Sequence, residues 1–282
     1  MEAPGTNIRS GQRLAVVVGA GGMAMAAARR LGNTYRLFVV DRDGDHLGRQ
    51  LAALRAEGHD AAGMPCDVTE ADDVRACADA VAGIGPVHAL AHVVGLSPSM
   101  GDAEAILRVN LRGPALVAEA FLPLVASGGA GLFVSSVSGH LGPLLGEVGP
   151  EILEILDEPL AYDLVERVFA RTGPMAPPTA YQYTKTALIR MVRRQAAAWG
   201  ARGARIVSLS PGMIGTPMGA QEYANPNKMA LFQRTPLGRE GTMVEIADAF
   251  EFLLSDRASF ISGTDLLVDG GLAAAVSADA AG

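Results

Sequence analysis

Short apolar runs alternate with helix-like segments along almost the whole chain. The run at residues 14–18 (LAVVV) is apolar at every position, as in a strand that is buried on both faces of a sheet. Strands that alternate with helices pair in parallel, because each helix carries the chain back to the end of the sheet at which the previous strand began. The sequence therefore predicts an α/β fold with a doubly wound parallel sheet, whose further strands are 36–40, a short strand ending near 66, 87–94, 131–137, 204–210 and 264–271. The predicted helices are 23–31, 45–58, 70–83, about 102–126, 181–200 and 243–255.

Length and composition narrow the functional classes. With 282 residues, no internal repeat and no linker, we expect one domain over residues 1–282. Cys66 and Cys77 lack metal or redox spacing, so we expect both to be reduced and no metal to be bound. No apolar run reaches the ~20 residues of a membrane span, and the first residues lack a signal core. Reduced cysteines lead us to expect a cytoplasmic protein. The net charge of −7 argues against a nucleic-acid surface, so we expect a small-molecule substrate and binding to neither membrane nor nucleic acid.

Residues 141–178 interrupt the alternation. The segment is acidic, and its pattern predicts helix in two pieces that are split near Pro159. We interpret it as an insertion. Its apolar positions require a partner surface, which is the parent domain, a substrate or a second subunit; they are Ile152, Leu153, Ile155, Leu156, Leu164, Val165, Val168 and Phe169.

A glycine loop after the first strand predicts a dinucleotide site. Gly19, Gly21 and Ala24 have the GxGxxA spacing, in which the first glycine allows the turn and the second lets the backbone approach a pyrophosphate. Gly22 and Met23 then open a helix, whose first N–H groups can bind phosphate. The loop therefore predicts a Rossmann fold, although glycine turns are common and the motif alone is weak.

Acidic residues after the next two strands predict the adenosine end of that site. Asp41 ends the second strand, where a carboxylate accepts hydrogen bonds from the ribose and repels a 2′-phosphate, so we predict NAD rather than NADP. The adjacent Arg42 weakens this preference, and Asp41 could instead be an ordinary turn residue. Asp67 and Val68 follow the third strand and are predicted to flank the adenine, with a helix cap as the alternative role of Asp67.

Tyr181 and Lys185 form the predicted chemical site. Their spacing puts a phenol and an ammonium on one face of a helix. A tyrosine is a poor base at neutral pH, but a nearby ammonium stabilises its phenolate, which can then exchange a proton with an alcohol. Only Lys185 and Lys228 among 23 basic residues are lysine, so a position that keeps lysine is informative. An ammonium also suits the cofactor's ribose hydroxyls.

From about residue 12 to 273 the chain resembles the short-chain dehydrogenase/reductase family. The resemblance implies that Tyr181 is the acid/base and that Lys185 binds the ribose. It implies that Ser136 bonds the substrate oxygen, with Ser135 and Ser138 as weaker candidates. Asn110 in RVNLRG would support a proton-relay water, with a structural hydrogen bond as the alternative.

The same resemblance supplies the remaining cofactor contacts. SLSPGMIGTPM at 208–218 matches the family's stretch after the sixth strand, which assigns Pro211 and Gly212 to the nicotinamide end. There Ile214 would meet the carboxamide through its backbone and Thr216 the carboxamide or phosphate region. Val94 and Gly95 follow the fourth strand and are also predicted to contact the cofactor. A homodimer or homotetramer is expected.

The chain departs from the family in three places. The glycine loop is one residue shorter than usual, and Val18 replaces a threonine. His92-Val93-Val94-Gly95 replaces Asn-Asn-Ala-Gly; we expect His92 to be a structural histidine with satisfied hydrogen bonds. The insertion separates Ser136 from Tyr181 far more than usual. Hydroxysteroid dehydrogenase/carbonyl reductase members carry an insertion at a similar place, which suggests a changed dimer interface.

Residues 217–236 are predicted to form the lid over the substrate. Apolar side chains there favour a hydrophobic secondary alcohol or ketone, such as a steroid-like one, with packing of the lid itself as the alternative role. They are Met218, Tyr223, Met229, Leu231 and Phe232, with Met213 just before. Two alternatives are an NAD-binding sensor or assembly subunit without turnover and an NADP-dependent ketoreductase. A nucleotide-sugar epimerase shares the Tyr/Lys pair but is disfavoured, because little chain remains for a substrate domain.

Overall fold

Seven strands form one parallel sheet in the order β3-β2-β1-β4-β5-β6-β7. The computed structural model describes residues 12–216 and 226–281. The chain crosses from β1 outward to β3 and then from β4 outward to β7, so the predicted doubly wound sheet is confirmed. The strands are β1 (Leu14–Val18), β2 (Arg36–Asp41), β3 (Ala61–Pro65), β4 (Val87–His92), β5 (Val125–Val134), β6 (Arg205–Pro211) and β7 (Asp265–Val268).

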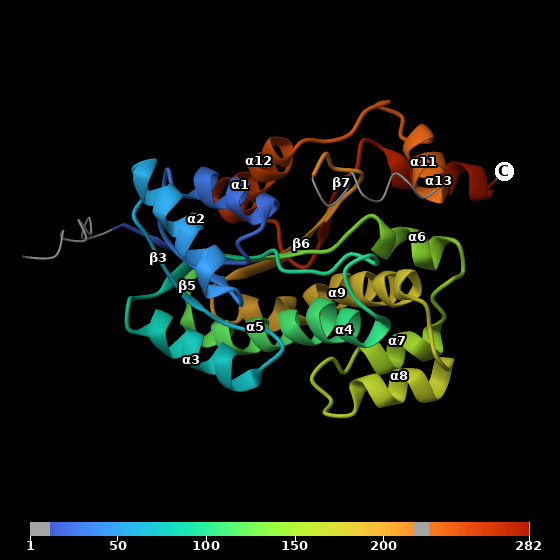
Figure 1. Cartoon of the computed structure of the whole chain (residues 1–282), viewed down its shortest axis with the longest axis horizontal. Helices are drawn as coiled ribbons and strands as arrows, with labels where there is room; N and C mark the ends of the chain where they lie inside the picture. Colours follow the sequence, from blue (N-terminus) through green and yellow to red (C-terminus); the bar gives the residue numbers. More distant parts are fainter. Residues whose placement is uncertain (1–11, 217–225, 282) are drawn as a thin grey trace, which may run out of the picture.

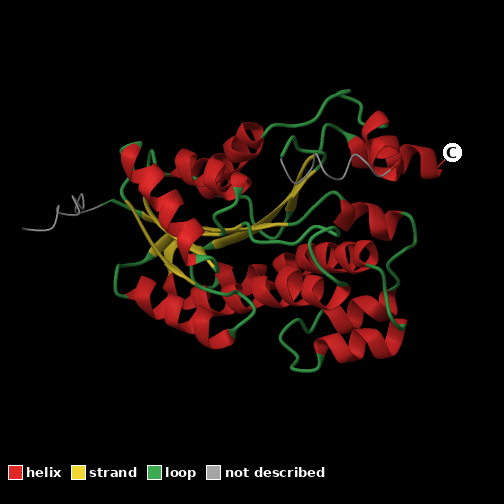
Figure 2. Cartoon of the chain, viewed as in Figure 1, coloured by secondary structure: helices red, strands yellow, loops and turns green. Residues whose placement is uncertain are grey.

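Helices cover both faces of the sheet (Figures 1 and 2). One layer consists of α1 (Gly22–Leu31), α2 (Gly44–Ala56) and α12 (Met243–Leu254), and the other contains α3 (Ala71–Ala82), α5 (Gly113–Phe121) and α9 (Pro177–Gly200). Alternate side chains of β1 enter the two cores: Ala15 and Val17 pack in the first, and Val16 and Val18 in the second. Burial on both faces explains why this strand is apolar throughout.

The predicted helix at 102–126 is interrupted and ends early. It consists of α4 (Ala103–Leu107), a π-helical turn η1 (Arg108–Arg112), α5 and a short 3-10 turn η2 (Leu122–Leu124). Strand β5 already begins at Val125, six residues before the predicted start at 131. The serine and two glycines at 127–129 hide this part of the strand, because they carry no apolar pattern.

The insertion packs against the parent domain. It contains the end of α6 (Ser138–Leu144), then α7 (Pro150–Leu156) and α8 (Leu164–Thr172), which are separated near Pro159 as predicted. Figure 1 shows α7 and α8 beside α9 and α4. Their buried side chains share one cluster with Leu107 and Ala187, so the parent domain is the surface that they required; they are Ile152, Leu156, Leu164, Val165 and Val168.

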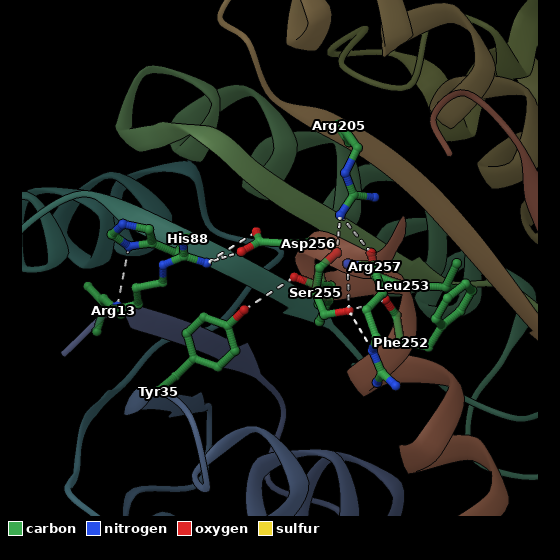
Figure 3. Close-up of polar contacts among 11 residues, drawn as sticks. Arg13, Tyr35, His88, Arg205, Phe252, Leu253, Ser255, Asp256 and Arg257 are labelled. Atoms are coloured by element: carbon green, nitrogen blue, oxygen red, sulfur yellow. Dashed lines mark hydrogen bonds and ion pairs between the residues drawn. The ribbon is translucent and has the colours of Figure 1, made fainter. Parts of the chain in front are cut away.

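A polar cluster fixes α12 at the amino end of the sheet (Figure 3). The buried guanidinium of Arg205, at the start of β6, donates to the carbonyls of Leu253 and Ser255 at 2.9 and 3.1 Å. These carbonyls lie at the carboxyl end of α12, where helix C=O groups lack partners. Arg13 binds Asp256 just beyond α12 through both carboxylate oxygens, at 2.9 and 3.1 Å. The cluster leaves the opposite, carboxyl end of the sheet open for a site.

Two further helices lie at that carboxyl end, α11 (Pro226–Gln233) and α13 (Leu272–Ala281). Neither follows from the sequence pattern. Leu272, Ala273 and Val276 of α13 pack against α6 in a small apolar cluster. Within 12–216 and 226–281, no helix has the length and apolar character needed to cross a membrane.

Candidate active site

A cavity of about 640 Å³ opens at the carboxyl ends of the strands. It is lined by Ser136 and by every residue that was predicted to contact the cofactor, namely Gly19, Gly21, Gly22, Met23, Asp41, Arg42, Asp67, Val68, Val94, Gly95, Tyr181, Lys185, Pro211, Gly212, Ile214 and Thr216. The switch between β1 and β4 lies at this edge, which is where open α/β sheets bind their ligands.

The glycine loop has the shape that a pyrophosphate requires. Gly19 has φ 114°, which disfavours other residues, and a Cβ there would lie 3.2 Å from the Val94 side chain. A Cβ on Gly21 would meet nothing within 4 Å. Helix α1 then begins at Gly22, and no side chain caps it. The open space at Gly21 and the uncapped amides of α1 therefore fit the pyrophosphate of a dinucleotide.

Asp41 joins the end of β2 to the glycine loop. One carboxylate oxygen accepts from the Ala20 amide at 2.8 Å and the other from the Asp43 amide at 3.0 Å. His46 of α2 lies with Nε2 2.9 Å from the Ala20 carbonyl, so the loop is held from two sides. Each carboxylate oxygen has a further lone pair. Asp41 can therefore serve both as a turn residue and as an acceptor for ribose hydroxyls.

The residues after β3 form the next part of the wall. Asp67 accepts from the Thr69 amide at 2.9 Å and from the Thr69 hydroxyl at 2.8 Å. It thus stabilises a turn before α3, whose N-cap is Glu70 rather than Asp67. Val68 is held close to η1 and α5, since a Cβ on Gly113 would lie 2.9 Å from its side chain.

Lys185 lies buried at the centre of the cavity wall. Its Nζ donates to the Val134 carbonyl at 3.0 Å and lies 5.5 Å from the centre of the Tyr181 ring. Burial lowers the pKa of Lys185 to about 8, because the charged form loses its hydration. The helix is also tied to the end of β5, where the Ser135 hydroxyl donates to the Lys185 carbonyl at 2.8 Å.

The three candidate serines have different environments. Ser135 uses its hydroxyl for that bond to α9, so it serves the helix rather than the open space. Ser136 lines the cavity, and its hydroxyl oxygen accepts from the Ser138 amide at 3.2 Å. Ser138 begins α6. Of the three, Ser136 best combines a fixed position with access to the same space as Tyr181.

Asn110 lies behind the cavity rather than on its surface. It sits in the π-helical turn and is fully buried. Its amide makes two bonds to the backbone of Leu96, accepting at 2.7 Å and donating at 2.9 Å. These two bonds hold the Leu96 backbone against the π-helical turn. Gly95 lies between Asn110 and Lys185, since a Cβ there would be 3.4 Å from both Oδ1 and Nζ.

The expectation that His92 has satisfied hydrogen bonds is wrong. The ring is fully buried and stacks on Phe133, with ring centres 5.6 Å apart. Neither ring nitrogen has a hydrogen-bond partner among the described residues. Burial, with the field of the Lys185 ammonium, lowers the pKa of His92 to about 3, so the imidazole is neutral at physiological pH.

Several residues of the cavity wall were not predicted from the sequence. Leu96, Ser97 and Met100 line the cavity and follow β4, where the rule that ligands bind beyond strand ends could have found them. Met243 of α12 also lines it, and no local pattern signals this. From the predicted lid, Met218 and Tyr223 lie outside the described residues. The other predicted lid side chains do not line the described cavity, and Leu231 packs on the cluster of α6 and α13.

No group of three or more His, Cys, Asp or Glu side chains within the described chain could hold a metal ion. Cys66 and Cys77 are both buried and not disulfide-bonded. The cavity places a phenol, an ammonium and hydroxyls beside the glycine loop.

Comparisons with known proteins agree on one family. Residues 13–147 match the family described as short chain dehydrogenase, and residues 166–273 match one described as Enoyl-(Acyl carrier protein) reductase. The short-chain dehydrogenase/reductase bsc3 of Alternaria brassicicola is 31% identical over 95% of this chain and 98% of its own length. The 3-alpha-hydroxysteroid dehydrogenase/carbonyl reductase of Comamonas testosteroni is 31% identical over 78% of this chain and 89% of its own length. The crystal structure of gox2181 has the same fold, with a TM-score of 0.76 at 23% identity, covering 93% of this chain and 96% of that one.

Proposed function

The chain belongs to the short-chain dehydrogenase/reductase family and is an oxidoreductase of alcohols and ketones, and we propose that it uses NAD(H) on a neutral, hydrophobic secondary alcohol or ketone. The observation that carries the proposal is the placement of Tyr181, Lys185 and Ser136 on the wall of one cavity with the glycine loop. NAD would accept the hydride of the alcohol carbon there, and NADH would return it to a ketone.

The residues of the chain handle the proton. The Lys185 ammonium, 5.5 Å from the Tyr181 ring centre, favours the phenolate. In alcohol oxidation the phenolate oxygen of Tyr181 takes the hydroxyl proton while the hydride leaves the carbon, and in ketone reduction the phenol returns it. The Ser136 hydroxyl donates a hydrogen bond to the substrate oxygen. Lys185 also binds the ribose, whose hydroxyls suit a compact ammonium.

The preference for NAD rests on Asp41. Its carboxylate is held at the end of β2 by the Ala20 and Asp43 amides, on the cavity wall. A fixed negative charge at this place accepts from ribose hydroxyls and repels a 2′-phosphate. Arg42 is exposed beside it. The fixed carboxylate therefore supports NAD over NADP.

The apolar part of the cavity wall supports the substrate class. Leu96 packs in one cluster with Tyr181, and Met100, Val137 and Met213 also line the cavity. Apart from Lys185, the charged side chains that line the described cavity are Asp41, Arg42 and Asp67, which lie at or just after the ends of β2 and β3. A carboxylate, sulfonate or phosphate of a substrate would find no guanidinium near Tyr181 in the described wall. This arrangement supports a neutral substrate, and the hydroxysteroid relative supports one of steroid type.

We further propose a homodimer or homotetramer. Phe260 is fully exposed, and Leu266 and Leu267 of the edge strand β7 are each more than a third exposed. Apolar side chains on an unpaired edge favour association. Helices α7 and α8 cover part of α9, so that part of α9 is not available to a second subunit. Light scattering of the purified chain is expected to give two or four times the chain mass of 29.1 kDa. A monomer at micromolar concentration would contradict this part.

Cofactor and substrate can be tested together. Titration of nicotinamide fluorescence is expected to give NADH a Kd at least about tenfold below that of NADPH, a difference of ~1.4 kcal/mol. Asp41→Ser is expected to remove most of this difference. Neutral alicyclic and steroid alcohols are then expected to be oxidised faster than polyols or hydroxy acids. Tighter NADPH binding, or faster turnover of the polar alcohols, would reject the corresponding part of the proposal.

A further inference from the structure

His92 is a buried polar side chain without a structural explanation. It ends β4, pairs in register with Phe133 of β5 and is fully buried, yet both ring nitrogens lack a partner in the described chain. A neutral imidazole carries one donor and one acceptor, and leaving them unpaired in the interior lowers stability. Phenylalanine or leucine would fill the same space without that loss. A group of this kind calls for a functional reason.

The buried Lys185 ammonium needs acceptors for its hydrogen-bond donors, and the His92 imidazole has an acceptor nitrogen. An ammonium has three donors, and one of them bonds the Val134 carbonyl at 3.0 Å. Val134 directly follows Phe133, on which His92 stacks, and Gly95, three residues after His92, faces Nζ. Both side chains therefore lie near the carboxyl ends of β4 and β5, and the Lys185 ammonium contributes to the lowered pKa of His92.

The pocket around them holds few other polar groups. The pKa of Lys185 is governed by burial, with no contribution from a carboxylate of the described chain. Polar groups near Lys185 include the phenol of Tyr181 on α9 and the carbonyl of Val134 on β5, and the Asn110 amide of η1 lies on the other side of Gly95. The Asn110 amide is already bonded to Leu96.

We propose that His92 is a positioning residue for Lys185: its neutral imidazole accepts a hydrogen bond from one bound water that the buried ammonium also holds, and this link keeps the lysine charged. This inference rests on the proposed function, because the charged lysine is what favours the Tyr181 phenolate. Keeping Lys185 charged is a role that neither Tyr181 nor Ser136 performs. Since His92 does not line the cavity, it acts only through Lys185.

The composition of the chain makes a direct test possible. Lys185 and Lys228 are its only lysines, so in a Lys228→Arg background, NMR of protein with ¹³C-labelled lysine reports Lys185 alone. In that background we expect Lys185 to titrate with a pKa of about 8. His92→Phe keeps the ring stack but removes the nitrogens, and is expected to lower this pKa by about one unit, a tenfold change in the protonation equilibrium. His92→Gln, which restores a donor and an acceptor, is expected to bring it back.

The outcomes separate this inference from the proposed function. The lysine titration needs neither cofactor nor substrate, and His92→Leu serves if the phenylalanine variant does not fold. An unchanged lysine pKa in a folded apolar variant overturns the inference. In active protein, the pH of half-maximal alcohol oxidation is expected to rise by about one unit in His92→Phe and to return in His92→Gln. A shifted lysine without any alcohol oxidation in the unmodified chain would reject the proposed function instead.

Discussion

At the scale of single residues, Gly19 and Gly21 of the nucleotide loop have different roles. Gly19 has φ 114° and touches Val94, so it is required by the backbone and by packing. Gly21 has φ −72°, which any residue adopts, and a side chain there would extend into open space. The spacing motif does not distinguish these roles, because both positions are simply glycine. Only the backbone angle and the surroundings separate folding from ligand binding.

The contrast predicts that one alanine substitution lowers stability and the other lowers NADH affinity. Gly19→Ala is expected to destabilise the fold by at least ~1 kcal/mol, because it forces a Cβ into a left-handed conformation. Gly21→Ala is expected to change stability by less than ~1 kcal/mol but to raise the Kd for NADH by about tenfold or more, since the methyl group occupies the pyrophosphate space. Urea unfolding and fluorescence titration measure the two effects. Unchanged NADH affinity in Gly21→Ala would contradict the assignment.

The buried His92 predicts a pH dependence of stability. Its pKa is about 3 in the folded chain against an ordinary value of 6.5, so between these values the unfolded chain binds the proton and the folded chain does not. The stability that depends on neutral His92 is therefore complete above pH 6.5 and is lost as the pH falls toward 3. Relative to His92→Phe, the unfolding free energy of the unmodified chain is expected to fall by ~1.4 kcal/mol per pH unit in this window. Urea unfolding at pH 7, 6 and 5 tests this, and a constant difference would refute it.

At the scale of elements, apolar periodicity located the strands and helices well where a segment packs on the sheet. Apolar periodicity did not locate helix ends and irregular turns, which depend on other features of the chain. Helix α9 begins at Pro177 rather than 181 because proline suits the first turn of a helix, and the π-helical turn around Asn110 leaves no trace in the pattern. Helix α13 went unnoticed because alanine, which dominates it, marks neither face. These misses concern ends and irregular turns, which side-chain polarity does not specify.

The packing of the insertion can be tested by one truncation. Leu156 of α7 is 1% exposed within the cluster that joins α7 and α8 to the parent domain. Leu156→Ala is expected to destabilise the protein by ~2–5 kcal/mol, through lost burial and the cavity left behind. Tyr162 lies in the same insertion but is 90% exposed, so Tyr162→Ala is a matched control with an expected change within ~0.5 kcal/mol. Equal effects on urea unfolding would show that the insertion does not pack in this way.

At the scale of the whole molecule, the site exists because parallel strands end at one edge. Segments from Gly19 to Met243 meet in one cavity, and those that directly follow a strand could be placed there from sequence. Met243 could not, because it comes from a helix whose start lies near Gly22 only in the folded chain. Nor could the missing partners of His92, since hydrogen bonding in a core depends on distances that no pattern encodes.

The central claim is that Tyr181 exchanges the proton beside a bound nicotinamide. Tyr181→Phe keeps the ring beside Lys185 and removes only the hydroxyl. We expect kcat for oxidation of a neutral secondary alcohol to fall by about 10²–10⁴-fold, while the Kd for NADH, measured by fluorescence on the same protein, changes by less than about threefold. Retained turnover in Tyr181→Phe with intact NADH binding would contradict the account.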